Sequence, residues 1–483
     1  NHNRNCQECD KNGKCELLHV AQITGAREGL YEGEQTPVTI DKVTPSIKRD
    51  TSKCVLCGRC IERCKSAHGL SVLGFEKRGF KTIVAPAQNR SFADVPCILC
   101  SQCVSVCPTG ALMEVSEIDK VDEAFRQGKY VVVQTAPAVR AALGEEFDMP
   151  IGTLVTGKMV AALRRLGFKK VFDTNFGADL TIMEEANELL DRVKNGGVLP
   201  MITSCSPGWI NYAEYYYGDQ LDHLSSCKSP HEMFGAILKS YYAERNGIKP
   251  EDMFVVSVMP CTAKKFEVGR DGQSAAGVPD VDVAITTREV GRMIQRAGIQ
   301  FKALKDEAFD DPFAHGTGAG IIFGATGGVM EAALRYAAEA ILGKKLEKVE
   351  FNEVRGVEGV KFAAYKLGNL EVKVAVASGT KNAKELLNKV KSGEVDVQFI
   401  EIMACPGGCV NGGGQPYQPA SVRNSIDLRA VRAAVLYHAD EVADVRKSQE
   451  SSEVKALYDE YLGEPNGHKA HEILHTTYVK RGL

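Results

Sequence analysis

Cysteine spacing constrains this chain more than any other feature. Two runs share the pattern C-x2-C-x2-C-x3-C, so the sequence contains an internal duplication; the runs are Cys54, Cys57, Cys60, Cys64 and Cys97, Cys100, Cys103, Cys107. Three thiolates of such a run ligate one 4Fe-4S cluster, and the fourth ligates the other cluster. We therefore expect one cluster on Cys54, Cys57, Cys60 and Cys107, and a second on Cys97, Cys100, Cys103 and Cys64. Zinc also binds four thiolates, but two complete runs of this spacing favour clusters.

A third group of metal-binding residues precedes these runs. It consists of one imidazole and three thiolates, from His2, Cys6, Cys9 and Cys15. A zinc site with this ligand set is a fair alternative. Its position ahead of two ferredoxin-type runs favours a third 4Fe-4S cluster.

The remaining composition excludes several classes of protein. Eleven of the 16 cysteines precede residue 108, and their tight grouping in a 483-residue chain indicates metal binding rather than disulfides. The net charge of -3 gives no broad basic face for nucleic acid. No apolar run approaches the ~18 residues of a membrane span, and the N-terminal residues lack a signal-peptide pattern. We expect a cytoplasmic protein.

The rest of the chain reads as an α/β domain. Short β-branched runs at 130–133 and 254–258 alternate with amphipathic stretches such as 329–341, which predicts buried strands between helices. Apolar runs at 198–203, 255–259 and 397–403 lead directly to Cys205, Cys261 and Cys405. Ligands bind at the carboxyl ends of strands in such sheets. We therefore expect the five solitary cysteines to converge on one site.

Three segments resemble the signatures of the FeFe-hydrogenase catalytic domain. They occur in the family's order and read Thr203-Ser-Cys-Ser-Pro-Gly-Trp209, Met259-Pro-Cys-Thr-Ala-Lys-Lys-Phe-Glu267 and Glu401-Ile-Met-Ala-Cys-Pro-Gly-Gly-Cys409-Val-Asn-Gly-Gly-Gly-Gln-Pro416. The resemblance covers residues 125–465 and, with the cluster domains, nearly the whole chain. It implies an enzyme that interconverts hydrogen with protons and electrons. Noncatalytic iron-sulfur assembly homologues and hydrogen sensors are the competing classes.

The resemblance implies an H-cluster, which is a 4Fe-4S cubane joined to a diiron unit carrying CO, CN and azadithiolate. By motif position Cys261, Cys405 and Cys409 ligate the cubane, and Cys409 bridges to the diiron unit. Lys264 is expected to hydrogen-bond a cyanide. Five further residues match positions of the family's pocket, although ordinary core packing explains them equally well: Pro137, Ala138, Met259, Met403 and Phe323.

Four residues match the family's proton relay: Cys205, Glu185, Ser225 and Glu188. Proton delivery to a buried site needs titratable groups within hydrogen-bonding reach of one another. Glu185 and Glu188 stand three residues apart on a predicted helix, so they share a face. Without the surrounding motifs, a surface carboxylate pair would be the simpler interpretation.

One position departs from the family pattern. Where many members have a second cysteine that ligates the cubane, this chain has Ser206. Cys227 is the one cysteine without another assignment, and thiolate suits iron-sulfur iron best. We therefore predict Cys227 as the fourth ligand. The Ser206 alkoxide, or Cys205 turned from relay to ligand, are the alternatives.

The resemblance also implies an organisation and partners. Ser206 and the His-ligated cluster resemble catalytic subunits of multimeric NAD(P)-coupled hydrogenases, some of which bifurcate electrons. No dinucleotide fingerprint is present, so ferredoxin or flavin- and NAD(P)-binding partner subunits are expected, along with maturation proteins. Relatives often carry a further 2Fe-2S domain. We expect a His-ligated module at 1–43, a ferredoxin-like domain at 44–116 and a two-lobed α/β catalytic domain at 117–483.

Overall fold

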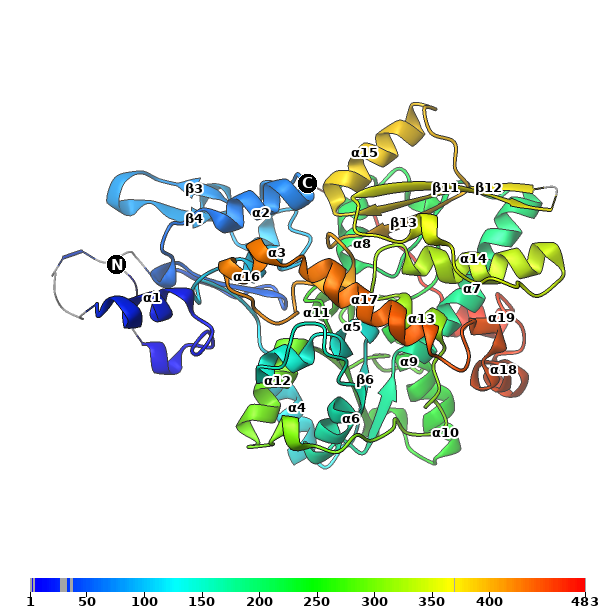
Figure 1. Cartoon of the computed structure of the whole chain (residues 1–483), viewed down its shortest axis with the longest axis horizontal. Helices are drawn as coiled ribbons and strands as arrows, with labels where there is room; N and C mark the ends of the chain where they lie inside the picture. Colours follow the sequence, from blue (N-terminus) through cyan, green and yellow to red (C-terminus); the bar gives the residue numbers. More distant parts are fainter. Residues whose placement is uncertain (1, 3–4, 27–32, 35–37, 369, 483) are drawn as a thin grey trace.

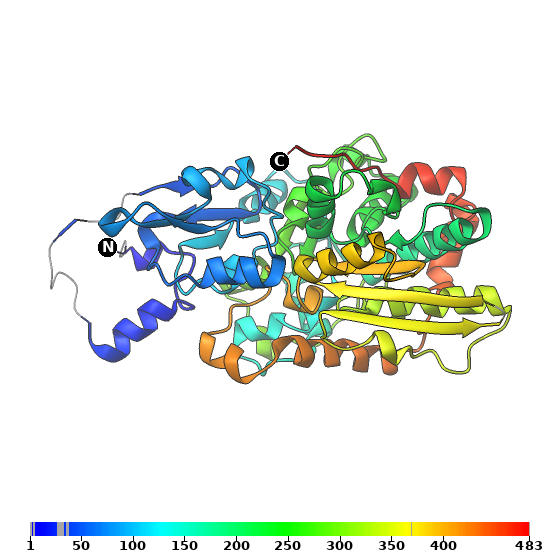
Figure 2. The same ribbon diagram turned by 90° about the horizontal axis from the view of Figure 1, so that it is seen from above.

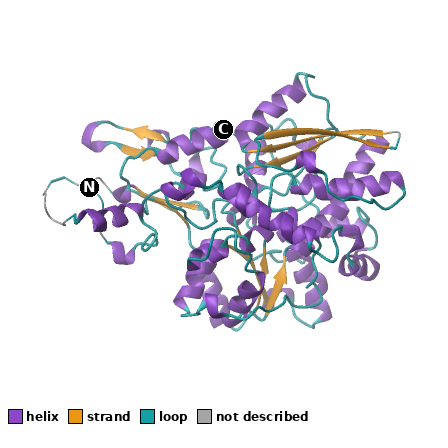
Figure 3. Cartoon of the chain, viewed as in Figure 1, coloured by secondary structure: helices purple, strands orange, loops and turns teal. Residues whose placement is uncertain are grey.

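The structure is a computed structural model that describes residues 2, 5–26, 33–34, 38–368 and 370–482. The N-terminal part lies to one side of a larger body built from two sheets and their covering helices (Figures 1 and 2). Helices predominate, and the longest strands lie in the larger body (Figure 3). In the described part of the chain, no helix combines the length and apolarity needed to cross a membrane.

Two small antiparallel sheets and short helices form the N-terminal part. One sheet has the order β1-β2-β5, and the other pairs β3 with β4. The elements are α1 Glu16–Thr24, β1 Ile40–Asp41, β2 Ile47–Asp50, α2 Arg59–His68, β3 Gly74–Glu76, β4 Ile83–Ala85, α3 Gln102–Ser105 and β5 Leu112–Glu114. Each four-cysteine run begins in a loop and continues onto a helix, so α2 carries Cys60 and Cys64, and α3 carries Cys103.

The first lobe of the larger body is a four-stranded parallel sheet in the order β10-β9-β6-β7. Its strands are β6 Tyr130–Thr135, β7 Lys170–Asp173, β9 Met253–Met259 and β10 Val283–Thr286. Apolar side chains on both faces are buried, as a parallel sheet requires. One face packs against α4 Ile118–Arg126, α6 Thr156–Arg165 and α12 Thr287–Arg296. The other packs against α7 Asn175–Asn195, α9 Pro230–Ile237, α18 Ser452–Leu457 and α19 His468–Leu474.

The second lobe contains a mixed sheet in the order β11-β12-β13-β8, in which only β11 runs antiparallel to its neighbour. Its strands are β8 Met201–Ile202, β11 Val360–Leu367, β12 Leu370–Ser378 and β13 Phe399–Met403. One face packs against α7 and α14 Gly328–Leu342, and the other against α8 Pro207–Tyr216 and α15 Thr380–Lys391. Six further α-helices of the described chain complete the body: α5 Pro137–Arg140, α10 Ala243–Arg245, α11 Lys264–Glu267, α13 Gly318–Ile322, α16 Ala420–Ser425 and α17 Leu428–Glu441.

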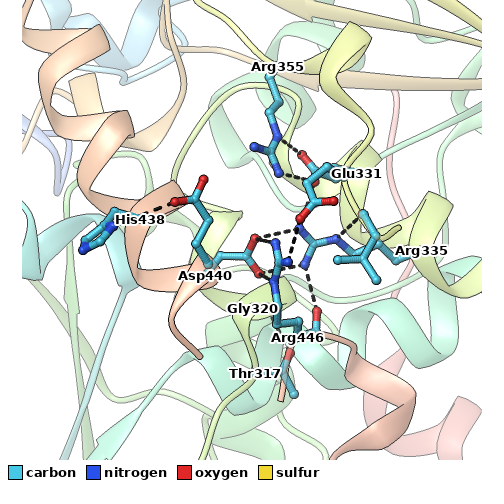
Figure 4. Close-up of polar contacts among 11 residues, drawn as sticks. Thr317, Gly320, Glu331, Arg335, Arg355, His438, Asp440 and Arg446 are labelled. Carbon is cyan, nitrogen blue, oxygen red and sulfur yellow. Dashed lines mark hydrogen bonds and ion pairs between the residues drawn. The ribbon is translucent and has the colours of Figure 1, made fainter. Parts of the chain in front are cut away.

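A buried ion network fastens the C-terminal segment to the second lobe (Figure 4). Asp440, on α17, lies 2.8 Å from the guanidinium of Arg335, on α14, and 2.7 Å from that of Arg446. Arg335 also pairs with Glu331 at 2.8 Å, and Arg355 pairs with Glu331 at 2.7 Å. Because opposite charges alternate in this network, each buried charge is neutralised by a neighbour.

A second buried ion pair joins the N-terminal part to the first lobe. Arg288, on α12, lies 2.8 Å from Glu114, on β5, and both side chains are fully buried. Two hydrogen bonds also connect the N-terminal part to the first lobe. Thr262 donates to the Leu99 carbonyl at 2.8 Å, and Ser46 donates to the Thr262 carbonyl at 2.7 Å. These contacts fix the N-terminal cysteine runs beside the loop that follows β9.

Candidate active site

A cavity lies where the carboxyl ends of strands from both sheets meet. The loops after β6, β7, β8, β9 and β13 all contribute to its walls. The sequence-based expectation that the cysteine-bearing loops follow strands is confirmed, because β9 ends at Met259, just before Cys261, and β13 ends at Met403, just before Cys405. Ligand sites form at such strand ends because the loops of several strands converge there.

Four of the five solitary cysteines reach this cavity: Cys205, Cys261, Cys405 and Cys409. Burial raises the pKa of the Cys405 thiol, and the neighbouring thiols of Cys261 and Cys409 raise it further. Burial and Cys261 likewise raise the pKa of Cys409 to about 12. Adjacent buried thiols that resist ionisation are well suited to a metal centre, since a bound metal supplies the positive charge that stabilises thiolates.

Glycines allow the loop after β13 to pack against its neighbours. A Cβ at Gly412 would lie 2.1 Å from the Pro260 carbonyl oxygen, and one at Gly413 would lie 2.0 Å from the Cys100 carbonyl oxygen. Gly408 has a φ of 93°, a region that side chains disfavour. The loop carrying Cys405 and Cys409 can therefore touch both the loop after β9 and the second cysteine run.

The five predicted pocket residues, Pro137, Ala138, Met259, Met403 and Phe323, all line the cavity. Lys264 lines it too, on α11. Its ammonium nitrogen lies 2.6 Å from Glu267 Oε2 and donates to the Cys205 carbonyl at 3.3 Å.

Glu267, which holds Lys264 in place, and its partner His231 were not predicted from the sequence. Glu267 Oε2 is also 2.6 Å from His231 Nε2. Burial opposes ionisation of Glu267, but Lys264 and His231 hold the pKa of this carboxyl below its usual value. The three-residue spacing of Lys264 and Glu267 on one helix was the available signal.

The predicted relay residues lie close together beside the cavity. Ser225 Oγ donates to Glu188 Oε2 at 2.8 Å. Burial, aided by the Glu188 carboxylate, raises the pKa of Glu185 to about 8, although the nearby Ser225 hydroxyl opposes the shift. Burial and Glu185 also raise the pKa of the Cys205 thiol. Arg192, four residues after Glu188 on α7, pairs with it at 2.7 Å. Arg192 was not predicted from the sequence, although its i, i+4 spacing from Glu188 was a signal.

The geometry does not support the prediction that Cys227 is the fourth cubane ligand. Cys227 does not line the cavity, whereas Ser206 does. Residue 227 instead forms an antiparallel bridge with His475. Its thiol lies 3.9 Å from Glu188 Oε2. The side chain of Cys227 therefore contacts Glu188 rather than the cavity that Cys261, Cys405 and Cys409 line.

The N-terminal cysteines gather in the predicted sets. One cavity is lined by Cys54, Cys57, Cys60 and Cys107 together. In the other set, burial raises the pKa of the Cys97 thiol, and the nearby thiol of Cys64 raises it further. Cys100, of the same set, lines the catalytic cavity, and its sulfur lies 3.2 Å from His68 Nε2. The second cysteine run is thus in direct contact with the catalytic cavity.

The first group of ligand candidates lies partly beside residues outside the described part, namely 1, 3–4, 27–32 and 35–37. Burial lowers the pKa of His2, and its Nδ1 is buried without a hydrogen bond among the described residues. Cys9 Sγ lies 3.7 Å from Lys53 Nζ, and Cys15 Sγ accepts a hydrogen bond from Leu18 N at 3.4 Å. An unpartnered buried imidazole nitrogen fits a metal ligand.

Family models match three parts of the chain. "Iron only hydrogenase large subunit, C-terminal domain" matches residues 129–413. "Iron hydrogenase small subunit" matches residues 426–481, and "4Fe-4S binding domain" matches residues 96–113.

Relatives match nearly the full length. The NADP-reducing hydrogenase subunit HndD of Solidesulfovibrio fructosivorans is 49% identical over 99% of this chain and 82% of its own length. Iron hydrogenase 1 of Clostridium pasteurianum is 44% identical over 99% of this chain and 84% of its own.

The fold matches solved structures as well. A variant of the FeFe-hydrogenase HydA1 from Chlamydomonas reinhardtii superposes with a TM-score of 0.67 and 42% identity, covering 75% of this chain and 99% of that one. The predicted fold class, iron-sulfur modules followed by an α/β catalytic domain, is confirmed. The chain therefore belongs to the FeFe-hydrogenase, or iron-only hydrogenase, family, and it is a hydrogenase oxidoreductase with iron-sulfur clusters.

Proposed function

We propose that this chain catalyses the reversible conversion of hydrogen to protons and electrons at an H-cluster, with three N-terminal 4Fe-4S clusters carrying the electrons. The observation that carries the proposal is the single cavity on which Cys205, Cys261, Cys405 and Cys409 converge from both lobes while Cys100 lines its wall. One site then has access to metal ligands, a proton-bearing thiol and an electron carrier.

Cys261, Cys405 and Cys409 would hold the cubane, and Cys409 would also hold the diiron unit. Ser206 is the proposed fourth ligand, since it lines the same cavity, although an alkoxide is harder than thiolate. When bound, the H-cluster would supply the iron at which the H–H bond is formed or broken. The apolar side chains Met259, Met403 and Phe323 would keep water from this centre, while Pro137 and Ala138 close one wall.

Lys264 would face an anionic diatomic ligand of the diiron unit. Its ammonium group is held in place by Glu267 and the Cys205 carbonyl. A cation beside an anion in an enclosed cavity interacts more strongly than it would in water. Glu267 and His231 would thus act as positioning residues for Lys264.

Protons would travel between solvent and the cavity through Glu188, Ser225, Glu185 and Cys205. Ser225 donates to Glu188 at 2.8 Å, whereas both carboxyl oxygens of Glu185 are buried without a hydrogen bond among the described residues. A proton would therefore pass between Glu185 and Ser225 through a bridging water or after a small side-chain movement. The pKa of about 8 lets Glu185 hold and release a proton near neutral pH. Cys205 would hold the last proton on Sγ, because burial and Glu185 disfavour its thiolate.

Electrons would reach the cavity through the cluster on Cys64, Cys97, Cys100 and Cys103. The cluster on Cys54, Cys57, Cys60 and Cys107 and the cluster on His2, Cys6, Cys9 and Cys15 would lie farther from it. The three proposed modules accordingly span residues 1–43, 44–116 and 117–483.

Similarity to HndD, named an NADP-reducing hydrogenase subunit, supports flavin- and NAD(P)-binding partner subunits. Electron bifurcation, a further 2Fe-2S cluster and a cytoplasmic location stay predictions.

Infrared spectroscopy combined with activity measurement tests the proposal. The anaerobic protein is reconstituted with iron and sulfide, mixed with a synthetic diiron precursor, and assayed for hydrogen evolution on the same sample. CO and CN bands together with hydrogen evolution are expected. Bands without turnover would contradict the relay, and absence of bands would favour a noncatalytic iron-sulfur protein.

A further inference from the structure

We propose that Cys227, His475 and Glu188 form a binding site for a borderline-soft divalent cation such as Zn²⁺, and that a cation bound there blocks proton transfer. The ligand atoms of these three residues all lie within 4.8 Å of one another. The site is separate from the catalytic cavity, which none of the three lines. Inhibition by the bound cation rests on the proposed role of Glu188 in the relay, whereas binding of the cation does not depend on that role.

The fold brings the three residues together from distant segments. Residues 227 and 475 face each other in an antiparallel bridge. The bridge is held by Lys228 N donating to the Leu474 carbonyl and Thr476 N donating to the Ser226 carbonyl, both at 2.8 Å. Side chains of directly opposed residues project to the same side of a bridge. Glu188 approaches from α7, with Oε2 3.9 Å from Cys227 Sγ.

The histidine is oriented as metal-binding histidines usually are. His475 Nε2 lies 3.0 Å from Glu184 Oε2, and Nδ1 lies 2.8 Å from Ser226 Oγ. A carboxylate only accepts hydrogen bonds, so Nε2 carries the proton and Nδ1 keeps its lone pair. Histidine ligands commonly donate their second nitrogen to a carboxylate in this way. A metal ion bound through Nδ1 would displace the Ser226 hydroxyl from this nitrogen.

The charge around the site favours a cation. Burial disfavours the Cys227 thiolate, and Glu188, Glu185 and Glu184 disfavour it further. A divalent ion would reverse this effect, because it offsets several negative charges at once. Arg192 is the opposing cation. It binds Glu188 Oε1, however, which leaves Oε2 directed toward Ser225 and Cys227.

Tetrahedral zinc would require the three donor atoms, which lie within 4.8 Å of one another, to move closer together. Bond lengths of about 2.0–2.3 Å place the donor atoms of such a site roughly 3.3–3.8 Å apart. The sulfur–oxygen distance of 3.9 Å is already close to this range. Three protein donors leave one position for water. A bound ion would hold Glu188 Oε2, so this carboxylate could no longer exchange protons with Ser225.

Zinc X-ray absorption tests occupancy without relying on activity. The anaerobic holoenzyme is stripped of adventitious zinc with a chelator and given one equivalent of ZnSO₄, and iron content is checked for loss of clusters. The expected zinc K-edge spectrum has one sulfur at about 2.3 Å and nitrogen or oxygen at about 2.0 Å. Cys227→Ala should lose the sulfur shell. A spectrum without sulfur, with several sulfurs, or unchanged in Cys227→Ala overturns the site.

Dye-driven hydrogen evolution at increasing zinc concentration tests the blockade. The rate of hydrogen evolution of each variant in the presence of zinc is divided by the rate of the same variant without zinc. Cys227→Ala and His475→Gln should raise the half-inhibitory zinc concentration about tenfold or more, because each removes a ligand. His438→Gln, an exposed histidine on α17, should leave it unchanged. Equal sensitivity of all variants overturns the blockade. An enzyme inactive without zinc would instead refute the proposed function, and the absorption spectrum would still decide occupancy.

Discussion

At the scale of single residues, Glu185 shows how a proposed relay group can reduce stability. Its pKa of about 8 exceeds the ~4.3 of an unfolded glutamate. Between these values the folded chain binds a proton that the unfolded chain has lost. Glu185 therefore destabilises the fold increasingly as pH rises from about 4.3 to about 8, and the cost near pH 7 is up to about 4 kcal/mol.

Glu185→Gln should therefore lower turnover and raise stability. Hydrogen evolution is expected to fall roughly 100-fold or more, since glutamine cannot transfer a proton, while CO and CN bands persist. The anaerobic melting temperature should exceed that of the wild type at pH 8, and the difference should vanish near pH 4.5. A variant with normal turnover, or one destabilised at pH 8, would refute this account of Glu185.

Ser206 offers a test of the fourth ligand. Ser206→Cys should keep the cubane and retain cluster iron, because thiolate is the preferred ligand. Ser206→Ala removes the donor and should lower the iron bound at this site. Iron analysis and electron paramagnetic resonance of reconstituted protein measure both. Cys227→Ala, measured alongside, should retain the cubane, because Cys227 lies outside the cavity. Cubane loss in Cys227→Ala but not in Ser206→Ala would restore Cys227 as the ligand.

At the scale of elements, the site depends on how closely the strand-end loops approach one another. Gly412→Ala would place a Cβ 2.1 Å from the Pro260 carbonyl oxygen, so the loop with Cys405 and Cys409 must move away from Cys261. We expect reduced cubane content, measured as iron per chain. Gly74→Ala is the matched control, since a Cβ there meets nothing within 4 Å. Equal iron in the two variants would show that the loop tolerates displacement.

The attachment of α17 depends on the buried network of Figure 4. Asp440→Asn keeps the side-chain size but removes the charge that neutralises Arg335 and Arg446. Breaking a buried ion pair costs about 3–5 kcal/mol, so the melting temperature should fall clearly. Glu441→Gln is the control, because its exposed pair with His438 at 3.8 Å contributes little. Similar melting temperatures for both variants would mean that the network adds no net stability.

At the scale of the whole molecule, local sequence patterns predicted that cysteine-bearing loops follow buried strands. Apolar β-branched runs became β6 and β9, and the cysteines after β9 and β13 reached one cavity. The placement of Cys227 could not be predicted, because its bridge with His475 joins segments far apart in the chain. Cys227 was the one cysteine without another assignment, but the sequence does not show where its side chain lies. The ion pair between Arg288 and Glu114 could not be predicted for the same reason, since no local pattern identifies residues that pair across a long stretch of sequence.

The order of the proposed clusters gives a prediction that involves the whole chain. Cys100 lines the catalytic cavity, whereas Cys57, in the cluster set farther out, is exposed. A small reductant such as methyl viologen could therefore deliver electrons at Cys57 and bypass the module of His2, Cys6, Cys9 and Cys15. Removing that outer cluster should spare dye-driven turnover, while removing the cluster next to the cavity should interrupt every route.

Cys9→Ala and Cys100→Ala form the matched pair. Each removes one cysteine ligand and should lower iron by about four atoms per chain if its cluster is lost. Cys9→Ala should retain most dye-driven hydrogen evolution, and Cys100→Ala should lose nearly all of it. The CO and CN bands, recorded on the same samples, must persist in both variants, so that loss of activity reports electron transfer rather than loss of the H-cluster. Equal losses in the two variants would contradict a serial path that ends at Cys100.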